Sequence, residues 1–295
     1  MMPQQQQLPL SPGETLDVDL DEVVRVTYLL EQSFRYDYPE PVRQLRHRLL
    51  VLPPIRHGDQ HLRARRLDVQ GAAARRVTRQ DRRGNTVLRL QADRVERSVQ
   101  FQVRALVERV VGDGPARLPA AAMDDPLLLR PTRLTAPDAR LRELAEELRR
   151  EMLTPVELAG RICQTVHAAM TYEHDVTSIH TTAAEAFALG RGVCQDSAHI
   201  MLALCHLLAV PARYVSGHLI GQGGTHAWVE VVTAHHEEAV ALPFDPCHGT
   251  PANARYLTVA TGRDYADVPP TSGSYLGAAR GRLTTDRSVA VVTAA

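Results

Sequence analysis

The regular alternation of apolar and polar residues between positions 23 and 109 constrains the fold of this chain more than any other feature. It recurs in the stretches VVRVTYLL, LRHRLLVL, RRLDVQ, TVLRLQ and SVQFQVRALVERV. A period of two residues puts the apolar side chains on one face of a β-strand, so each stretch is typical of a half-buried strand. Between two of them, DRRGNTV carries Gly84 and Asn85, which favour a hairpin turn. We therefore predict an antiparallel β domain over residues 19–111.

The distribution of charge follows from the same alternation. The formal net charge is +0, although residues 43–104 hold 16 arginines against 5 acidic residues, and the chain contains no lysine. We interpret most of these arginines as the solvated faces of strands. A protein that binds single-stranded nucleic acid also needs stacking aromatic residues, and these are nearly absent from the basic stretch. We therefore expect neither nucleic acid nor a membrane as a partner.

Residues 1–18 are rich in glutamine and proline and are predicted to form a disordered tail. They lack the basic segment and the apolar stretch of a signal peptide. No apolar stretch approaches the ~20 residues that a membrane-spanning helix needs. These features lead us to expect a cytoplasmic protein. In that compartment, the 4 cysteines are poor candidates for a disulfide framework.

The pattern changes in the second half of the chain. Residues 112–137 contain several prolines and are predicted to be a linker. Capping residues and apolar spacing then predict helices over 138–151, 154–170, 181–190 and 194–209. Strands are predicted at 212–219, 225–232, 238–244 and 287–294. We assign residues 138–295 to a second domain that combines helices with an antiparallel sheet.

Cys194 stands at the start of the predicted helix that continues as the apolar run IMLALCHLLAV. The positive end of a helix dipole favours a thiolate, and Gly190 and Gly192 allow backbone or substrate to come close to the sulfur. A buried helix is also a rigid support for a nucleophile. Free cysteines are nevertheless among the most buried residue types. This helix by itself is therefore compatible with either a nucleophile or a core residue.

Two later stretches supply the partners that a cysteine nucleophile needs. His226 lies in the predicted strand THAWVEVV, and Asp245 ends the next strand, EAVALPF. Adjacent strands would bring the carboxylate close enough to orient the imidazole, and the imidazole could then face the sulfur of Cys194. The three residue types in this order indicate a Cys–His–Asp relay.

The blocks GVCQDSAHIMLALCHLLAVPARYVSGHL, HAWVEV and FDP resemble, in order and spacing, the three signature blocks of the bacterial transglutaminase-like superfamily. TYEHDVTSIHTTAAEAF and GRDYADVPPTSG are also similar to this family. The β-rich first hundred residues resemble the N-terminal region of many bacterial members. The resemblance implies an α+β fold with a papain-like core, in which a helix bearing the cysteine packs on an antiparallel sheet. An antiparallel β domain would precede this catalytic domain.

Carried over to this chain, the resemblance makes Cys194 the nucleophile, His226 the general base and Asp245 the orienting carboxylate. Attack on a carboxamide or peptide carbonyl would give a thioester, which water or an amine resolves. The expected substrate is a peptide or a protein, and no cofactor and no metal are expected. The chain departs from the family at Cys247, where Thr is usual, and at His218, where Tyr is common. A family Trp in the strand before Asp245 is also missing.

Other residues are candidates for the oxyanion hole and the substrate groove. The backbone N–H of Cys194 at the helix start is a natural oxyanion donor, and Tyr172 or Gln195 could supply a second. Trp228 follows His226 by two residues, so it points to the same face of a strand. It would either wall the groove or belong to the core.

A metal site is one alternative to this assignment. The residues of ligand type in this region are Cys194, His199, Cys205, His206, Cys247 and His248. Cys194 and His199 diverge around a helix, and Cys194 and Cys205 lie roughly 16 Å apart along it. No metal site is therefore predicted.

A non-catalytic binding or scaffold module is a second alternative, although such family members typically lack a triad residue. Within the enzyme interpretation, hydrolysis by a peptidase or amidase is preferred to amine transfer, because bulk water is the default acceptor. The oligomeric state stays open.

Overall fold

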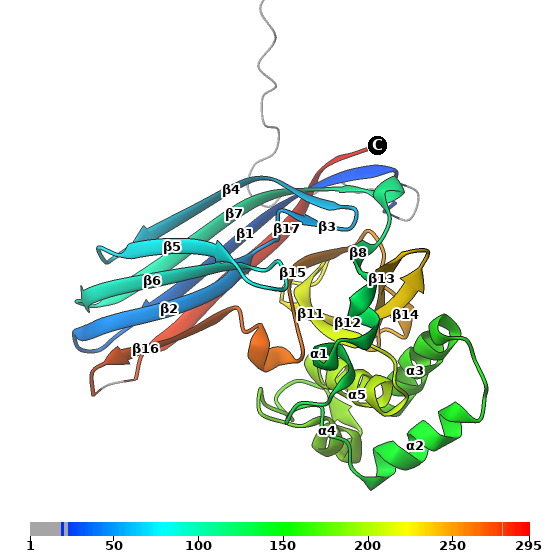
Figure 1. Ribbon diagram of the computed structural model, residues 1–295. Helices are drawn as coiled ribbons and strands as arrows, with labels where there is room; N and C mark the ends of the chain where they lie inside the picture. The colour runs from blue at the N-terminus through cyan, green and yellow to red at the C-terminus, as the bar shows by residue number, and fades with distance from the viewer. Residues whose placement is uncertain (1–18, 21–22, 279) are drawn as a thin grey trace, which may run out of the picture.

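The computed structural model describes residues 19–20, 23–278 and 280–295, so the predicted tail at 1–18 lies outside the described residues. Figure 1 shows two parts: an elongated β-structure and a second part in which helices cover a sheet. Nearly all strand pairs are antiparallel. The predicted α+β class is confirmed. Within the described ranges, none of the helices combines the length and hydrophobicity that crossing a membrane requires.

The elongated part is a sandwich of two antiparallel sheets. The first has the order β17-β1-β7-β4-β3, with β17 at Arg282–Ala294, β1 at Arg25–Asp37, β7 at Ser98–Val110, β4 at Gln60–Gln70 and β3 at Arg56–His57. The second has the order β16-β2-β6-β5, with β16 at Thr271–Leu276, β2 at Val42–Leu52, β6 at Thr86–Val95 and β5 at Arg75–Gln80. Phe34 and Phe101 of the first sheet pack against Leu49 and Leu90 of the second. All five strands predicted in this region are present.

The chain returns to this sandwich at its end. β16 pairs with β2, and β17 pairs with β1 along almost its whole length. The strand predicted at 287–294 is present within β17. The predicted second domain, residues 138–295, includes both β16 and β17. Strand pairing places them in the sheets of the sandwich, because the outer edges of β1 and β2 accept these two strands. The division of the chain into domains otherwise stays a prediction.

The second part is built on a sheet with the order β14-β13-β12-β11-β15, to which β8 adds by pairing with β13. These strands are β14 at Thr250–Pro251, β13 at Glu238–Asp245, β12 at His226–His235, β11 at Ala212–Leu219, β15 at Tyr256–Gly262 and β8 at Ala116–Pro119. The predicted linker therefore contributes a strand to this sheet. It also contains the short helices η1 at Val111–Asp113, η2 at Ala120–Asp124 and α1 at Pro126–Leu129.

The helices of the second part lie together beside this sheet (Figure 1), and the helix that begins at Cys194 packs on β11 and β12. They are α2 at Ala139–Arg149, α3 at Pro155–Ala169, α4 at Ala183–Leu189, α5 at Cys194–Leu207 and η3 at Tyr265–Asp267. A parallel pair of short strands, β9 at Thr171–Tyr172 and β10 at Arg191–Gly192, lies just before α5. Helix α5 is buried almost throughout, as its uniformly apolar sequence indicates.

Two buried side-chain amides of the sandwich hold β15, the last strand in this sheet. Gln60 donates to the Thr258 carbonyl and accepts from its N–H, both at 2.8 Å. Asn85 makes the same pair of bonds with Thr261, also at 2.8 Å. Each amide thus replaces the hydrogen bonds that a further strand would make. The predicted hairpin turn carries Asn85, and Gly84 in this turn has a φ of 81°.

We expect Asn85→Ala to lower the free energy of unfolding by about 2–3 kcal/mol, because it leaves a buried N–H and a buried carbonyl of Thr261 unpaired. Urea denaturation followed by circular dichroism measures this change. Gln164→Ala, at an exposed site of α3, is the control and should stay within about 0.5 kcal/mol of the parent. Equal stability of the two variants would contradict the role assigned to Asn85.

Candidate active site

Cys194 is the first residue of α5, where β10 ends and the helix begins. Its side chain is partly buried. Asp196 stabilises the start of the helix. Its Oδ2 accepts hydrogen bonds from the Val193 N–H at 2.8 Å and from Thr177 Oγ1 at 2.6 Å. A Cβ at Gly192 would lie only 2.5 Å from that oxygen. Glycine therefore stands here because the backbone passes so close to the Asp196 carboxylate.

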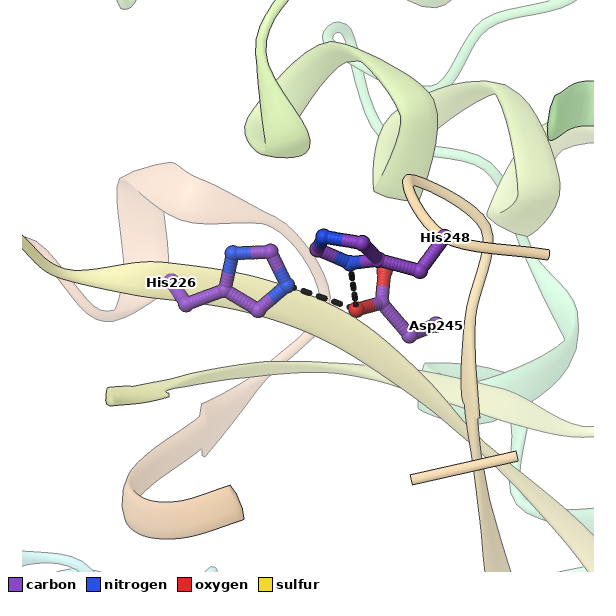
Figure 2. Close-up of side chains that lie close together, drawn as sticks. All are labelled: His226, Asp245 and His248. Carbon is purple, nitrogen blue, oxygen red and sulfur yellow. Dashed lines mark hydrogen bonds and ion pairs between the residues drawn. The ribbon is translucent and has the colours of Figure 1, made fainter. Parts of the chain in front are cut away.

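His226 and Asp245 meet at the adjacent ends of β12 and β13. His226 opens β12, Asp245 closes β13, and the two strands pair antiparallel. The imidazole Nε2 lies 2.7 Å from Asp245 Oδ2, and both side chains are buried (Figure 2). The expectation that adjacent strands bring these two residues together is confirmed. Since Nε2 bonds to the carboxylate, Nδ1 is the nitrogen left to face the Cys194 sulfur.

The pKa of His226 reflects opposing influences. Burial lowers it, but hydrogen bonds to Asp245 and Cys194 and the negative charge of both groups prevail and raise the pKa to about 9. Burial likewise raises the pKa of Asp245, but the hydrogen bond and the charge of His226 outweigh it and lower this pKa to about 2. At neutral pH the site therefore holds a protonated imidazole between a carboxylate and a sulfur.

The other cysteines have surroundings that suppress thiolate chemistry. Burial raises the pKa of Cys163 and of Cys247 to about 12, and the negative charge of Asp245 adds to both effects. Burial also raises the pKa of Cys205. Cys194 is the cysteine that acts on the His226 imidazole and raises its pKa. The structure thus distinguishes it from the other three.

Asp245 has further partners that the sequence analysis did not assign to it. Its Oδ2 also lies 2.7 Å from His248 Nδ1 and accepts a hydrogen bond of 2.7 Å from the Tyr256 hydroxyl. Its Oδ1 accepts from the Cys247 N–H at 2.8 Å. Figure 2 shows both imidazoles directed at the same carboxylate oxygen. The position of His248, three residues after Asp245, is a sequence signal for this contact. Tyr256 comes from β15, and nothing in the sequence indicates that it contacts Asp245.

His226, Asp245 and His248 are also the residues that could hold a metal ion. One ligand atom from each lies within 4.8 Å of the others, and this is the single such group in the described part of the chain. In this structure their atoms are hydrogen-bonded to one another. His199, weighed as a ligand from sequence, instead accepts a hydrogen bond from the Tyr265 N–H in the protein interior.

The three groove candidates have different surroundings. Trp228 is 1% exposed and packs with Val215 and Tyr256, and its ring stacks on His226 with centroids 6.3 Å apart. It therefore belongs to the core beneath the site. Tyr172 is 52% exposed, and burial followed by the charges of Cys194 and Cys247 raises its pKa. Its electrostatic interaction with the Cys194 sulfur keeps it a candidate for the groove.

Gln195 is nearly buried, and its Nε2 donates to the Ser178 carbonyl at 3.5 Å. This contact directs the amide toward the loop that precedes α4. The oxyanion role considered for Gln195 stays a prediction, as does that of Tyr172.

Comparison with known proteins places this geometry in a family. Residues 142–246 match the transglutaminase-like superfamily, and residues 28–108 match the bacterial transglutaminase-like N-terminal region. An uncharacterized protein of Mycobacterium leprae is 29% identical over 174 residues, 56% of this chain and 59% of that protein. An uncharacterized protein of Mycobacterium tuberculosis is 34% identical over 172 residues, 54% of each. The matched region thus spans little more than half the length of these relatives.

The fold has a counterpart among solved structures. A crystal structure from Cytophaga hutchinsonii, named "a Putative Cysteine Protease", matches with a TM-score of 0.72 over 91% of this chain and 91% of that chain, at 21% identity. The likeness covers both the sandwich and the helix-covered sheet. The two family matches thus place a transglutaminase-like core at residues 142–246, preceded by a bacterial transglutaminase-like N-terminal region at residues 28–108.

Proposed function

We propose that this protein catalyses cysteine-dependent acyl transfer on peptide or carboxamide substrates, with Cys194 as nucleophile, His226 as general base and acid, and Asp245 as the orienting carboxylate. One observation carries the proposal: a buried imidazole hydrogen-bonds to a carboxylate, and a cysteine at a helix start acts on the same imidazole and raises its pKa. This is the arrangement that activates a sulfur nucleophile.

The reaction follows from these contacts. The Cys194 thiolate attacks the carbonyl carbon, a C–S bond forms, and the C–N bond breaks as His226 donates its proton to the leaving nitrogen. The product is a thioester. Water then attacks the thioester while His226 takes up its proton, and the C–S bond breaks to release a carboxylic acid and regenerate the cysteine. The Cys194 N–H at the start of α5 is the donor that we expect to stabilise the oxyanion.

Hydrolysis, as by a peptidase or amidase, is our preferred outcome of the second step, because water is the default acceptor. Amine transfer is the alternative, and it differs only in the group that attacks the thioester. A binding or scaffold module would need neither the buried ion pair nor its alignment with Cys194. Desolvating such a pair carries a cost in stability, which a catalytic role explains.

Alkylation with iodoacetamide tests the interaction of Cys194 with His226. We expect His226→Ala to slow alkylation of Cys194 at neutral pH by about tenfold or more, because the imidazolium that stabilises the thiolate is gone. Mass spectrometry of tryptic peptides measures the rate at each cysteine. His235→Ala is the matched control, since His235 lies exposed at the other end of β12. The proposal fails if both variants react at the rate of the parent.

Glutamine-containing peptides distinguish hydrolysis from transfer. Incubated with the enzyme, they should release ammonia or be cleaved, and a primary amine should not be incorporated as the main product. Mass spectrometry identifies each product. Cys194→Ala should abolish all of them, whereas Cys163→Ala should retain activity because Cys163 is a buried core thiol. Amine incorporation in excess of hydrolysis would establish the alternative, and activity in Cys194→Ala would contradict the mechanism.

The pKa of His226 predicts the pH dependence. The imidazole is protonated below pH about 9, so it can donate a proton to the leaving nitrogen only below that pH. We therefore expect kcat/KM for an amide substrate to fall as pH rises through about 9. An ester substrate, whose leaving group needs less protonation, should show a weaker fall. A kcat/KM that keeps rising beyond this range for the amide would exclude His226 as the acid.

A further inference from the structure

A hollow on the outer face of the second sheet of the sandwich has four arginines among its nine lining residues. It has a volume of about 420 Å³ and lies over β2, β5 and β6, which run side by side in Figure 1. None of the candidate catalytic residues contributes to it. The lining consists of Arg48, Arg75, Val77, Arg79, Gln80, Asp81, Val87, Arg89 and Gln91. Four arginines thus face one acidic residue.

The strand register sets these positive charges against one another. Arg48 of β2 lies directly opposite Arg89 of β6, and like charges in that position are destabilising. Burial lowers the pKa of Arg48, the charges of Asp81 and Asp267 oppose this effect, and the charge of Arg89 adds to it. Arg48 also donates a hydrogen bond of 3.2 Å to the Asp267 carbonyl. Arg79 of β5 lies opposite Val87 of β6, so its cross-strand neighbour carries no charge. The direct opposition of Arg48 and Arg89 is therefore unfavourable, and a bound anion would offset it.

Some arginines elsewhere on the sandwich have carboxylate partners. Arg63 pairs with Glu108, and Arg66 pairs with Asp68. In the described residues, by contrast, no carboxylate comes within 4.0 Å of the guanidinium nitrogens of Arg75, Arg79 or Arg89. These three arginines are the available donors of the hollow.

The remaining acidic residue of the hollow is already engaged. Asp81 Oδ1 accepts the N–H groups of Arg83 and Asn85, and Oδ2 accepts from the Asn85 side chain. Asp81 therefore holds its own hairpin turn, and its carboxylate oxygens are committed to that turn.

We propose that this hollow binds a small molecule that carries two or more phosphate groups. A guanidinium matches two oxygens at once, and a carboxylate is filled by one such contact. A phosphate offers three terminal oxygens, so it can accept from several arginines that converge. The volume lies within the roughly 300–1,000 Å³ of small-ligand pockets. The lining contains no aromatic side chain, so it lacks the stacking groups of a single-strand nucleic-acid site.

Calorimetric titration of the full chain with inorganic tripolyphosphate tests the proposal. We expect saturable binding that weakens as salt rises, and a loss of about tenfold or more in affinity for Arg79→Gln and for Arg89→Gln. Both residues are exposed, and circular dichroism and thermal melting verify that the variants fold. Arg65→Gln is the matched control: Arg65 is an exposed arginine of β4, away from the hollow, and its loss should leave the affinity unchanged.

Two competing ligands complete the experiment. Citrate, with three carboxylates, should bind at least tenfold more weakly than tripolyphosphate, and a double-stranded oligonucleotide should not bind more tightly. No measurable binding of tripolyphosphate would overturn the proposal. Equal weakening by Arg65→Gln would show general charge attraction and would also overturn it. Equal affinity for citrate would remove the phosphate preference, and tighter binding of the oligonucleotide would assign the face to nucleic acid instead.

Discussion

The burial of the Asp245 carboxylate is the constraint on which the arrangement of the site depends. A carboxylate that is 0% exposed has lost its hydration, and it is tolerated only where donors replace the water. Here the donors are His226 from β12, His248 and the Cys247 N–H from the loop after β13, and Tyr256 from β15. One side chain thus ties three segments together. The position of the His226 ring follows from this network.

A second buried carboxylate fixes the cysteine end of the site. Asp196 holds the Val193 N–H and the Thr177 hydroxyl, and burial raises its pKa. The close approach of this side chain to Gly192 sets the path of the chain into α5. The sulfur of Cys194 and the ring of His226 are therefore positioned by two separate networks. The buried helix α5 packs on β12 and so fixes the position of the Cys194 sulfur relative to the His226 ring.

The sandwich takes part in this arrangement and is more than an appended module. Its amides Gln60 and Asn85 complete the hydrogen bonding of β15, and β15 carries Tyr256, which donates to Asp245. The chain also crosses back into the sandwich through β16 and β17. A substitution of Gln60 or Asn85 would therefore affect the site through β15 and its Tyr256. The basic hollow, by contrast, lies on an outer sheet face where Arg75, Arg79 and Arg89 have no carboxylate within 4.0 Å among the described residues.

The sequence by itself determined the α+β class, most strands and helices, and the pairing of His226 with Asp245, because alternation, capping and motif order are local properties. It did not reveal β5, whose residues are all exposed and which therefore lacks the alternation of a half-buried strand. Only the tertiary structure decided that β16 and β17 return to the first sheets, that Tyr256 shares the Asp245 carboxylate, and that Trp228 is core. Each depends on contacts between segments far apart in the chain, and such contacts leave no periodic signal in the sequence.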